Sequence, residues 1–215
     1  MLRDLFFDFD GTIADTTQGI IRCTQATLRE LGLPASTPER IQATIGLPLR
    51  QCFALGTDTP EAQLDEAVAV YRRLFGEIAT PCIVLYEGVA ETLGLLYREG
   101  YRLSIATSRR GASLRMLLDR LGIGRFFVEL ATTEDVVHPK PAPDMVLLLL
   151  ERLGARAEES LVIGDTVFDL QMGRGAGCRT CGVSYGNQTR SELASAAPDR
   201  IIDSFSALPD VLLQF

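Results

Sequence analysis

The sequence has no Trp, one His, one Lys, few Cys and no long hydrophobic run. It contains 21 Lys or Arg against 28 Asp or Glu among 215 residues, so its formal net charge is −7. An acidic chain lacks the broad basic surface that non-specific nucleic-acid binding requires, so we expect no nucleic-acid partner. The longest apolar run, residues 145–150, is far shorter than the roughly 18 residues of a membrane-span candidate, and we expect no membrane anchor.

The five cysteines are odd in number and scattered along the chain, unlike the disulfide framework of a small secreted protein. The one close pair, Cys178 and Cys181, has neither a second pair nor the His-rich partner typical of a zinc site. We interpret this pair as part of a strand. The N-terminus also lacks a signal-peptide pattern, and together these features predict a reducing, cytoplasmic location.

Short apolar segments alternate with helical patterns over most of the chain. Such alternation predicts a doubly wound, mostly parallel, Rossmann-like α/β sheet covered on both faces. Ligands of these sheets bind beyond the carboxyl ends of the strands. The predicted strands are residues 5–9, 102–107, 126–131, 160–163, 178–184 and 200–203, and the predicted helices are 88–99, 112–121, 144–153, 167–175 and a terminal helix.

One stretch interrupts this alternation after the first strand. Its apolar residues recur at helical spacing over 16–31, and its later prolines stand where helices start rather than where they continue. No convincing strand pattern follows before residue 79. We therefore predict an α/β core formed by residues 1–14 and 86–215, with an all-helical cap at 15–85.

Polar side chains follow three of the predicted strands. Because a parallel sheet gathers the ends of its strands at one edge, we expect these side chains to meet. Carboxylates crowded into one crevice repel each other unless a cation is present, and Mg²⁺ is commonly bound by one or two carboxylates and a substrate phosphate. The residues are Asp8, Asp10 and Gly11 after the first strand, Thr107 and Ser108 after the second, and Asp165 and Asp169 after the fourth.

These residue types suit phosphoryl chemistry. Alternation places Asp8 and Asp10 on the same side of the strand, so one carboxylate can attack while the other handles protons. Gly11 lets the backbone approach a phosphate closely, and Thr107 offers hydroxyl and amide donors. Lys140 is the only lysine in the chain and stands between prolines. It supplies a compact positive charge opposite the carboxylates.

Each of these motifs, taken alone, can also be explained by a structural role without any function. An Asp-x-Asp before Gly is more often a turn than a metal site, Thr107 and Ser108 could simply cap a helix, and Asp165 could do the same. The joint occurrence of all the pieces, in this order and at strand ends, favours a functional site.

The whole constellation resembles the haloacid dehalogenase superfamily of aspartate-nucleophile phosphohydrolases, over essentially the entire chain. Residues 7–15, FDFDGTIAD, look like the first motif of that family. Thr107 is similar to its second motif. Lys140 with Pro141 and Pro143 is similar to the third, and Gly164 and Asp165 with the later Asp169 are similar to the fourth. A helical insertion directly after the first motif suggests the subgroup of phosphoglycolate phosphatases, pyrophosphatases and β-phosphoglucomutases.

The resemblance implies a Mg²⁺-dependent phosphatase that acts on a small phosphorylated metabolite through an aspartyl-phosphate intermediate. Asp8 would be the nucleophile and Asp10 the general acid–base. The implied phosphate-binding residues are Gly11, Thr107, Ser108 and Lys140. The implied metal ligands are Asp8, Asp10 through its backbone carbonyl, Asp165, and Asp169 through water or by supporting another ligand.

Two positions depart from the family pattern, and one cap residue is a candidate for specificity. Ser108 stands where many relatives have Asn, and Glu87 where relatives often have Pro. Residues 45–50 are similar to the substrate-specificity loop of the family. Arg50 is therefore a hypothesis for contact with the non-transferred part of an anionic substrate, with a solvated arginine as the alternative.

Several alternatives stay open. A phosphomutase or phosphotransferase of the β-phosphoglucomutase type would use the same residues, and a phospho-accepting signalling domain shares the acidic cluster but is shorter and has no helical insertion. The cap contains no lysine, which disfavours Schiff-base chemistry, and Asp10 disfavours a true dehalogenase. The substrate could be phosphoglycolate-like, a sugar phosphate, a nucleotide or pyrophosphate, and the protein a monomer or a homodimer.

Overall fold

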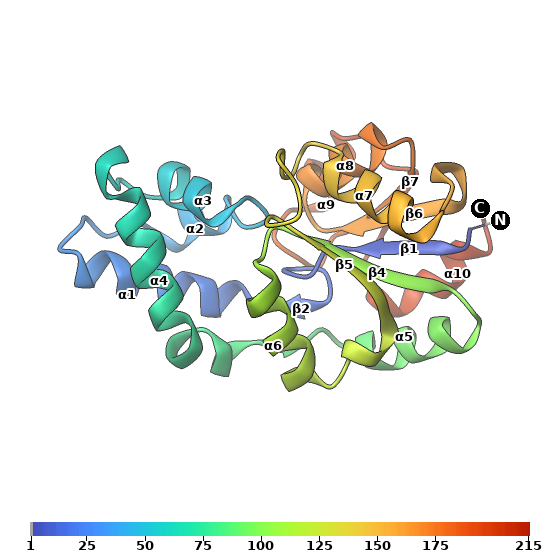
Figure 1. Ribbon diagram of the computed structural model, residues 1–215, viewed down its shortest axis with the longest axis horizontal. Helices are drawn as coiled ribbons and strands as arrows, with labels where there is room; N and C mark the ends of the chain where they lie inside the picture. Colours follow the sequence, from blue (N-terminus) through green and yellow to red (C-terminus); the bar gives the residue numbers. More distant parts are fainter. Residues whose placement is uncertain (1) are drawn as a thin grey trace.

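The computed structural model describes residues 2–215 of the chain, and a six-stranded sheet lies at its centre (Figure 1). Every neighbouring pair of strands in this sheet is parallel. In spatial order the strands are β5 (Phe127–Thr132), β4 (Arg102–Thr107), β1 (Asp4–Phe7), β6 (Ser160–Gly164), β7 (Arg179–Val183) and β8 (Arg200–Ile202).

Hydrophobic packing covers both faces of the sheet. Leu5 and Phe7 of β1 belong to one buried cluster, whereas Phe6 between them belongs to a second, because successive side chains of a strand point to opposite faces. The prediction of a doubly wound α/β sheet is confirmed. The first cluster includes side chains from α5 (Val89–Arg98), α6 (Gly111–Leu121) and α10 (Leu208–Leu212), and the second from α7 (Asp144–Leu153) and α8 (Val167–Gly175).

The predicted helical insertion lies beyond the carboxyl end of β1 (Figure 1). Its helices are α1 (Thr17–Glu30), α2 (Pro38–Gln42), α3 (Leu49–Gly56) and α4 (Leu64–Ile78), with short 3-10 turns at η1 (Glu61–Gln63) and η2 (Thr80–Cys82). Pro38 is the first residue of α2 and Pro48 precedes α3, as the sequence predicts. Buried side chains of α1 and α4, including Cys23, Leu28 and Tyr71, hold the two long helices together.

Two features were not predicted from the sequence. A two-stranded antiparallel ribbon of β2 (Ala14–Asp15) and β3 (Val84–Leu85) connects the insertion to the sheet. Strands of two residues are too short to show an alternating pattern. The other feature is α9 (Arg190–Ala194), a single turn started by a capping box at Thr189. Three further 3-10 turns are η3 (Gly124–Phe126), η4 (Ala157–Glu159) and η5 (Phe205–Ala207).

None of the helices within residues 2–215 has the length and apolar character needed to cross a membrane.

Candidate active site

The site lies where the strand order of the sheet reverses. Strand β1 pairs with β4 on one side and with β6 on the other, so the carboxyl ends of these three strands are adjacent. Asp8 directly follows β1, Thr107 is the last residue of β4, and Asp165 directly follows β6. Lys140 comes from the loop between β5 and α7. In open α/β sheets, this reversal point is where ligands bind.

Lys140 connects two of the predicted carboxylates. Its Nζ lies 2.5 Å from Asp8 Oδ1 and 2.6 Å from Asp169 Oδ1, and all three side chains are buried. Burial alone lowers the pKa of Lys140, but the attraction of the two carboxylates outweighs it and the pKa is raised. The lysine is therefore an ammonium ion at neutral pH. The only lysine of the chain thus meets the carboxylates of the first and fourth motifs.

Asp169 has a structural role as well as its contact with Lys140. Its Oδ2 accepts hydrogen bonds from the backbone N of Thr166 at 3.1 Å and from Thr166 Oγ1 at 2.7 Å. This arrangement caps the N-terminus of α8 and fixes the carboxylate. One oxygen of Asp169 is thus committed to the helix and the other to the lysine.

Asp165 is held by neutral groups only. Its Oδ2 accepts hydrogen bonds from the backbone N and the Nδ2 of Asn187, at 2.7 and 2.8 Å, and its Oδ1 accepts one from Thr12 Oγ1 at 3.2 Å. Gly11 has a φ of +83°, and a Cβ there would lie 2.1 Å from Asp165 Oδ2. Sequence reasoning selected Gly11 for phosphate approach, whereas the close packing against Asp165 also requires glycine there. It missed Asn187, which no motif indicates.

The carboxylates fit a divalent cation. One oxygen from each of Asp8, Asp165 and Asp169 lies within 4.8 Å of the others. Asp8 Oδ2 is buried and has no hydrogen-bond partner among residues 2–215. Counting the nearby Asp10, four carboxylates face two cationic side chains, Lys140 and Arg109. Carboxylate oxygens are the donors that Mg²⁺ prefers, so the donor type and the charge imbalance both suit it.

The electrostatics of the site in the absence of metal reflect this crowding. Burial raises the pKa of Asp8 well above its usual range, although the Lys140 ammonium opposes the shift and the other carboxylates reinforce it. Burial, followed by repulsion from Asp169, raises the pKa of Asp165 to about 7. Without a cation, these groups therefore hold protons that an exposed aspartate would release.

This shift predicts how pH affects stability. In the folded chain Asp165 keeps its proton up to about pH 7, whereas in the unfolded chain an aspartate releases it near pH 4. The stability contributed by the protonated carboxyl is therefore lost as the pH rises between these values. In EDTA at pH 7.5, we expect Asp165→Asn to be more stable than the wild type by roughly 2 to 4 kcal/mol, at about 1.4 kcal/mol per pKa unit.

Urea unfolding of both proteins at several pH values tests this expectation. The difference should shrink towards pH 4, and Mg²⁺ should stabilise the wild type but not the variant. If the difference in stability between the wild type and Asp165→Asn does not change with pH, the raised pKa of Asp165 is contradicted.

Asp10 forms a buried ion pair that sequence reasoning missed. Its two oxygens accept hydrogen bonds from Arg109 Nε at 2.7 Å and Nη2 at 2.6 Å. The Arg109 guanidinium carbon lies 5.6 Å from the ring centroid of Phe9 and 4.9 Å from that of Phe75, which belongs to α4 of the insertion. Because Arg109 comes two residues after Thr107, the neighbourhood of the second motif could have indicated it.

The side chain of Ser108 forms its hydrogen bond with the helical insertion and not with another residue at the edge of the sheet. Its Oγ donates a hydrogen bond of 2.6 Å to the backbone carbonyl of Gly46, in the loop between α2 and α3. Thr107 Oγ1 accepts a hydrogen bond of 3.3 Å from the backbone N of Arg109. The departure from Asn to Ser at position 108 thus coincides with a direct link between the sheet and the insertion.

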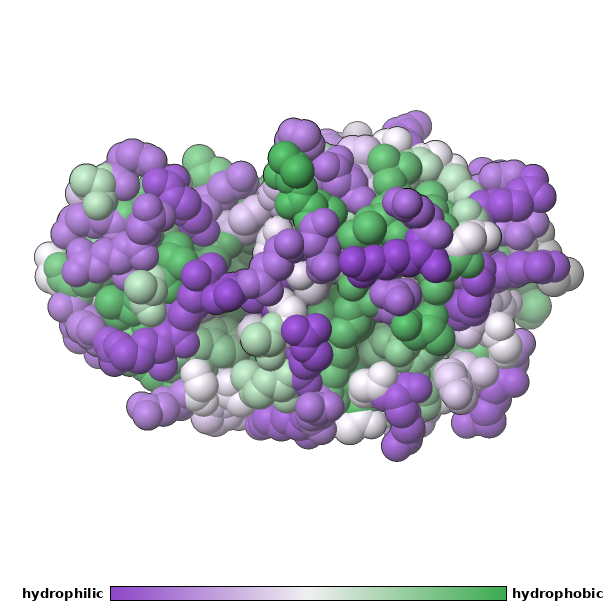
Figure 2. All heavy atoms as spheres, in the orientation of Figure 1, coloured by the Kyte–Doolittle hydropathy of each residue, from purple (hydrophilic) through white to green (hydrophobic). Residues whose placement is uncertain are grey.

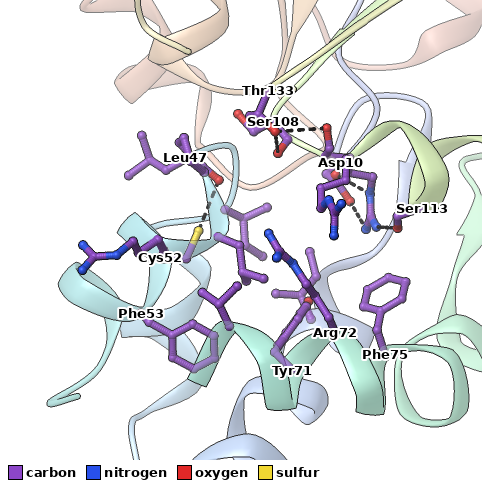
Figure 3. Close-up of a pocket in the computed structure, with 18 of the residues that line it drawn as sticks. Asp10, Leu47, Cys52, Phe53, Tyr71, Arg72, Phe75, Ser108, Ser113 and Thr133 are labelled. Atoms are coloured by element: carbon purple, nitrogen blue, oxygen red, sulfur yellow. Dashed lines mark hydrogen bonds and ion pairs between the residues drawn. The ribbon is translucent and has the colours of Figure 1, made fainter. Parts of the chain in front are cut away.

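A pocket of about 740 Å³ lies between the sheet edge and the insertion, and Asp8, Asp10 and Thr107 line it. Figure 2 shows apolar side chains in the hollow between these two parts of the molecule. The insertion contributes mainly apolar side chains to the lining, as the close-up in Figure 3 illustrates. They include Ile20, Ile41, Ile45, Leu47, Leu49, Phe53, Val68, Tyr71 and Phe75.

Two residues of this pocket, Arg50 and Cys52, already have interaction partners within the protein. Arg50 lines the pocket, but its Nη2 lies 2.7 Å from Glu61 Oε1 and its Nε lies 3.0 Å from Asp65 Oδ1. Cys52 donates a hydrogen bond through Sγ to the carbonyl of Thr44. Burial raises the pKa of Cys52 to about 12, so this cysteine is a neutral thiol and a poor nucleophile at neutral pH.

The doubly wound sheet, the acidic cluster at its switch point and the helical insertion together define an α/β protein with a polar site at the carboxyl edge of its sheet. The sequence model of the family described as "Haloacid dehalogenase-like hydrolase" matches residues 5–183. The chain therefore belongs to this family.

Individual relatives agree with this assignment. The chain is 39% identical over 206 residues to "Probable phosphatase IndB" of Dickeya dadantii, covering 94% of this chain and 90% of that protein. It is 31% identical over 229 residues to a phosphoglycolate phosphatase of Salmonella typhimurium, covering 96% and 91%. A putative haloacid dehalogenase-like hydrolase from Bacteroides fragilis has a similar structure, with a TM-score of 0.92, 31% identity, and coverage of 97% and 100%.

Proposed function

We propose that this protein is a magnesium-dependent phosphatase that hydrolyses a small phosphorylated metabolite through a phosphoryl group on Asp8. The observation that carries the proposal is the environment of this carboxylate. Lys140 holds Asp8 Oδ1, whereas Asp8 Oδ2 has no hydrogen-bond partner in the part of the chain that the structure describes, and Asp8 lines the pocket. One oxygen is thus oriented by a cation, and the other carries no hydrogen bond that would have to break before it attacks phosphorus.

The reaction has two steps on this chain. In the first, Asp8 Oδ2 attacks phosphorus, the bond to the leaving oxygen breaks, and Asp10 donates a proton to that oxygen. In the second, water attacks the phosphoryl group while Asp10 accepts a proton, and the bond to Asp8 breaks to release inorganic phosphate. Dividing the hydrolysis in this way replaces one difficult step with two easier ones. Arg109 orients Asp10 through both carboxylate oxygens, so one of these hydrogen bonds must be released for Asp10 to carry the proton that it donates.

The other predicted residues hold the phosphoryl group and the metal. Donors for the phosphoryl oxygens would come from Lys140, from the hydroxyl of Thr107 and from backbone amides near Gly11 and Ser108. A bound magnesium ion would supply positive charge that offsets the phosphoryl oxygens. Its ligands would be Asp8, Asp165 and the backbone carbonyl of Asp10, with Asp169 acting through water or through its hold on Lys140.

The insertion, residues 15–85, acts as a cap in this proposal. Two contacts support it: Ser108 on the sheet side bonds the carbonyl of Gly46, and Phe75 of α4 stacks on Arg109. The β2–β3 ribbon supplies both connections between the cap and the sheet. A closed cap excludes water from the site while the intermediate forms. Arg50 stays a hypothesis for specificity, and a cytoplasmic monomer or homodimer stays a prediction.

Phosphate release from a set of substrates tests the proposal. The set contains 2-phosphoglycolate, pyrophosphate, sugar phosphates, nucleotides and p-nitrophenyl phosphate, each assayed with Mg²⁺ and with EDTA. We expect release that EDTA reduces at least about 100-fold and that added Mg²⁺ restores, because the carboxylates repel an anionic ester when no cation is bound. Release that is unaffected by EDTA would contradict the metal dependence. Transfer of the phosphate to a second hydroxyl, rather than to water, would indicate a phosphomutase.

A further inference from the structure

Five arginines line the pocket, and their ion pairs separate them into two groups. Arg109 pairs with Asp10, Arg110 with Glu134, Arg50 with Glu61 and Asp65, and Arg73 with Glu30. Arg72 is different, since it forms no ion pair with a carboxylate among residues 2–215, although Glu134 attracts it from beyond ion-pair distance. Other exposed arginines within residues 2–215, such as Arg29 and Arg115, also form no ion pair, so Arg72 is informative because it combines this state with a place at the pocket wall.

The position of Arg72 on α4 directs it towards the site. Its neighbour Tyr71 and the following turn, at Phe75, both face the pocket, and Figure 3 shows the Arg72 side chain extending from α4 into the same space as Asp10. Partial burial, followed by repulsion from the Arg110 guanidinium, lowers the pKa of Arg72, and the attraction of the Glu134 carboxylate opposes this shift. The Arg72 guanidinium is thus partly desolvated and near another cation, and an anion bound there would relieve both effects.

The pocket is larger than the phosphoryl group alone requires. In the proposed function, the sheet edge holds the phosphoryl group, so the leaving part of the substrate extends towards the cap. The cap wall is mainly apolar, and Arg72 is its only cation without a carboxylate partner within the described part of the chain. A guanidinium is well suited to bidentate binding of a carboxylate or phosphoryl group.

We propose that Arg72 binds a second anionic group, a carboxylate or a phosphoryl group, on the leaving part of the substrate and thereby selects substrates that carry one. This assignment rests on the proposed phosphatase function and adds a substrate class to it. It differs from the Arg50 hypothesis, because the two carboxylates that pair with Arg50 compete with any substrate anion for its guanidinium.

A matched set of phosphate esters tests this assignment. 2-Phosphoglycolate carries a carboxylate, ethane-1,2-diol bisphosphate carries a second phosphoryl group, and 2-hydroxyethyl phosphate has a similar size but a neutral leaving group. We expect Arg72→Ala to lower kcat/KM roughly 10- to 100-fold for an anionic ester, mostly through KM, because a charge-assisted interaction is lost. The value for the neutral ester should change less than about threefold. The ester that loses more identifies the preferred anion.

Arg29→Ala is the control, since it removes the same charge from an exposed arginine of α1, in the same insertion, that is not among the residues lining the pocket. It should leave kcat/KM for all three esters near the wild-type values. Equal losses for neutral and anionic esters in Arg72→Ala would overturn the assignment. So would a selective loss in Arg50→Ala together with wild-type behaviour of Arg72→Ala.

Calorimetric binding in the Asp8→Asn background separates this inference from the proposed function. Arg72→Ala in that background should weaken binding of 2-phosphoglycolate by a similar factor and leave binding of 2-hydroxyethyl phosphate unchanged. If wild-type protein hydrolyses none of the esters but the selective loss of binding is found, the proposed function fails while the anion site stands. If Arg72→Ala binds 2-phosphoglycolate as tightly as its parent, the anion site is refuted regardless of turnover.

Discussion

Asp8→Asn is expected to abolish phosphate release, with kcat reduced at least roughly 10⁴-fold, because an amide oxygen is a very poor nucleophile towards phosphorus. The substitution is nearly isosteric, so Lys140 can still donate to the remaining side-chain oxygen. The amide also removes a buried negative charge from a crowded acidic cluster. We therefore expect the variant to fold and, in EDTA, to be at least as stable as the wild type.

Steady-state release from the best substrate of the wild type, with saturating Mg²⁺, measures this effect. Asp119→Asn is a suitable control, because Asp119 is exposed on α6 and the substitution makes the same chemical change. The control should retain wild-type kcat. Turnover that survives Asp8→Asn in protein purified free of contaminating phosphatases would mean that another group is the nucleophile.

Lys140→Met is expected to remove both activity and stability. The lysine is fully buried between Asp8 and Asp169, and methionine has a similar length without the charge. Removing one partner of a buried ion pair leaves an uncompensated charge, which typically costs about 3 to 5 kcal/mol. Activity should fall at least about 10³-fold, because Asp8 loses the cation that orients it and the phosphoryl oxygens lose a positive neighbour. Urea unfolding in EDTA and phosphate release measure the two effects.

A second substitution separates these two consequences. Adding Asp169→Asn to Lys140→Met removes one of the carboxylates left without a cation, and the amide oxygen can still accept the hydrogen bonds from Thr166 that cap α8. We expect the double variant to recover at least half of the lost stability and none of the lost activity. Recovery of activity together with stability would show that Lys140 serves the fold alone. Equal instability of the single and double variants would show that the missing charge is not the cause.

Much of the fold could be predicted from the sequence because its elements are long and periodic. The central strands β1, β4 and β6 are buried on both faces and appear as short apolar runs, and the helices between the strands show their buried stripe. The elements that were missed are the shortest, β2, β3 and α9. They depend on pairing or capping partners that are visible only in three dimensions.

The candidate residues at the strand ends could also be found, since the chemistry depends on residue types at those ends. Asp8, Thr107, Lys140 and Asp165 all lie at the carboxyl edge of the sheet, as the parallel topology requires. The partners that orient them were harder to find. Asn187 belongs to no recognisable pattern, Arg109 is indicated only by its place two residues after Thr107, and Arg72 is one of several similar arginines.

By itself, therefore, the sequence determined the class of fold, the insertion after the first strand, and the acidic and basic residues gathered at the sheet edge. Only the tertiary structure decided how the charges pair. Lys140 meets Asp8 across 132 residues and Arg109 meets Asp10 across 99. Local periodicity fixes the face on which a side chain lies, but it carries no information about the distant side chain that it meets. For this reason the unpaired state of Arg72, and with it the inferred preference for a second anion, emerges only when the cap is packed against the sheet.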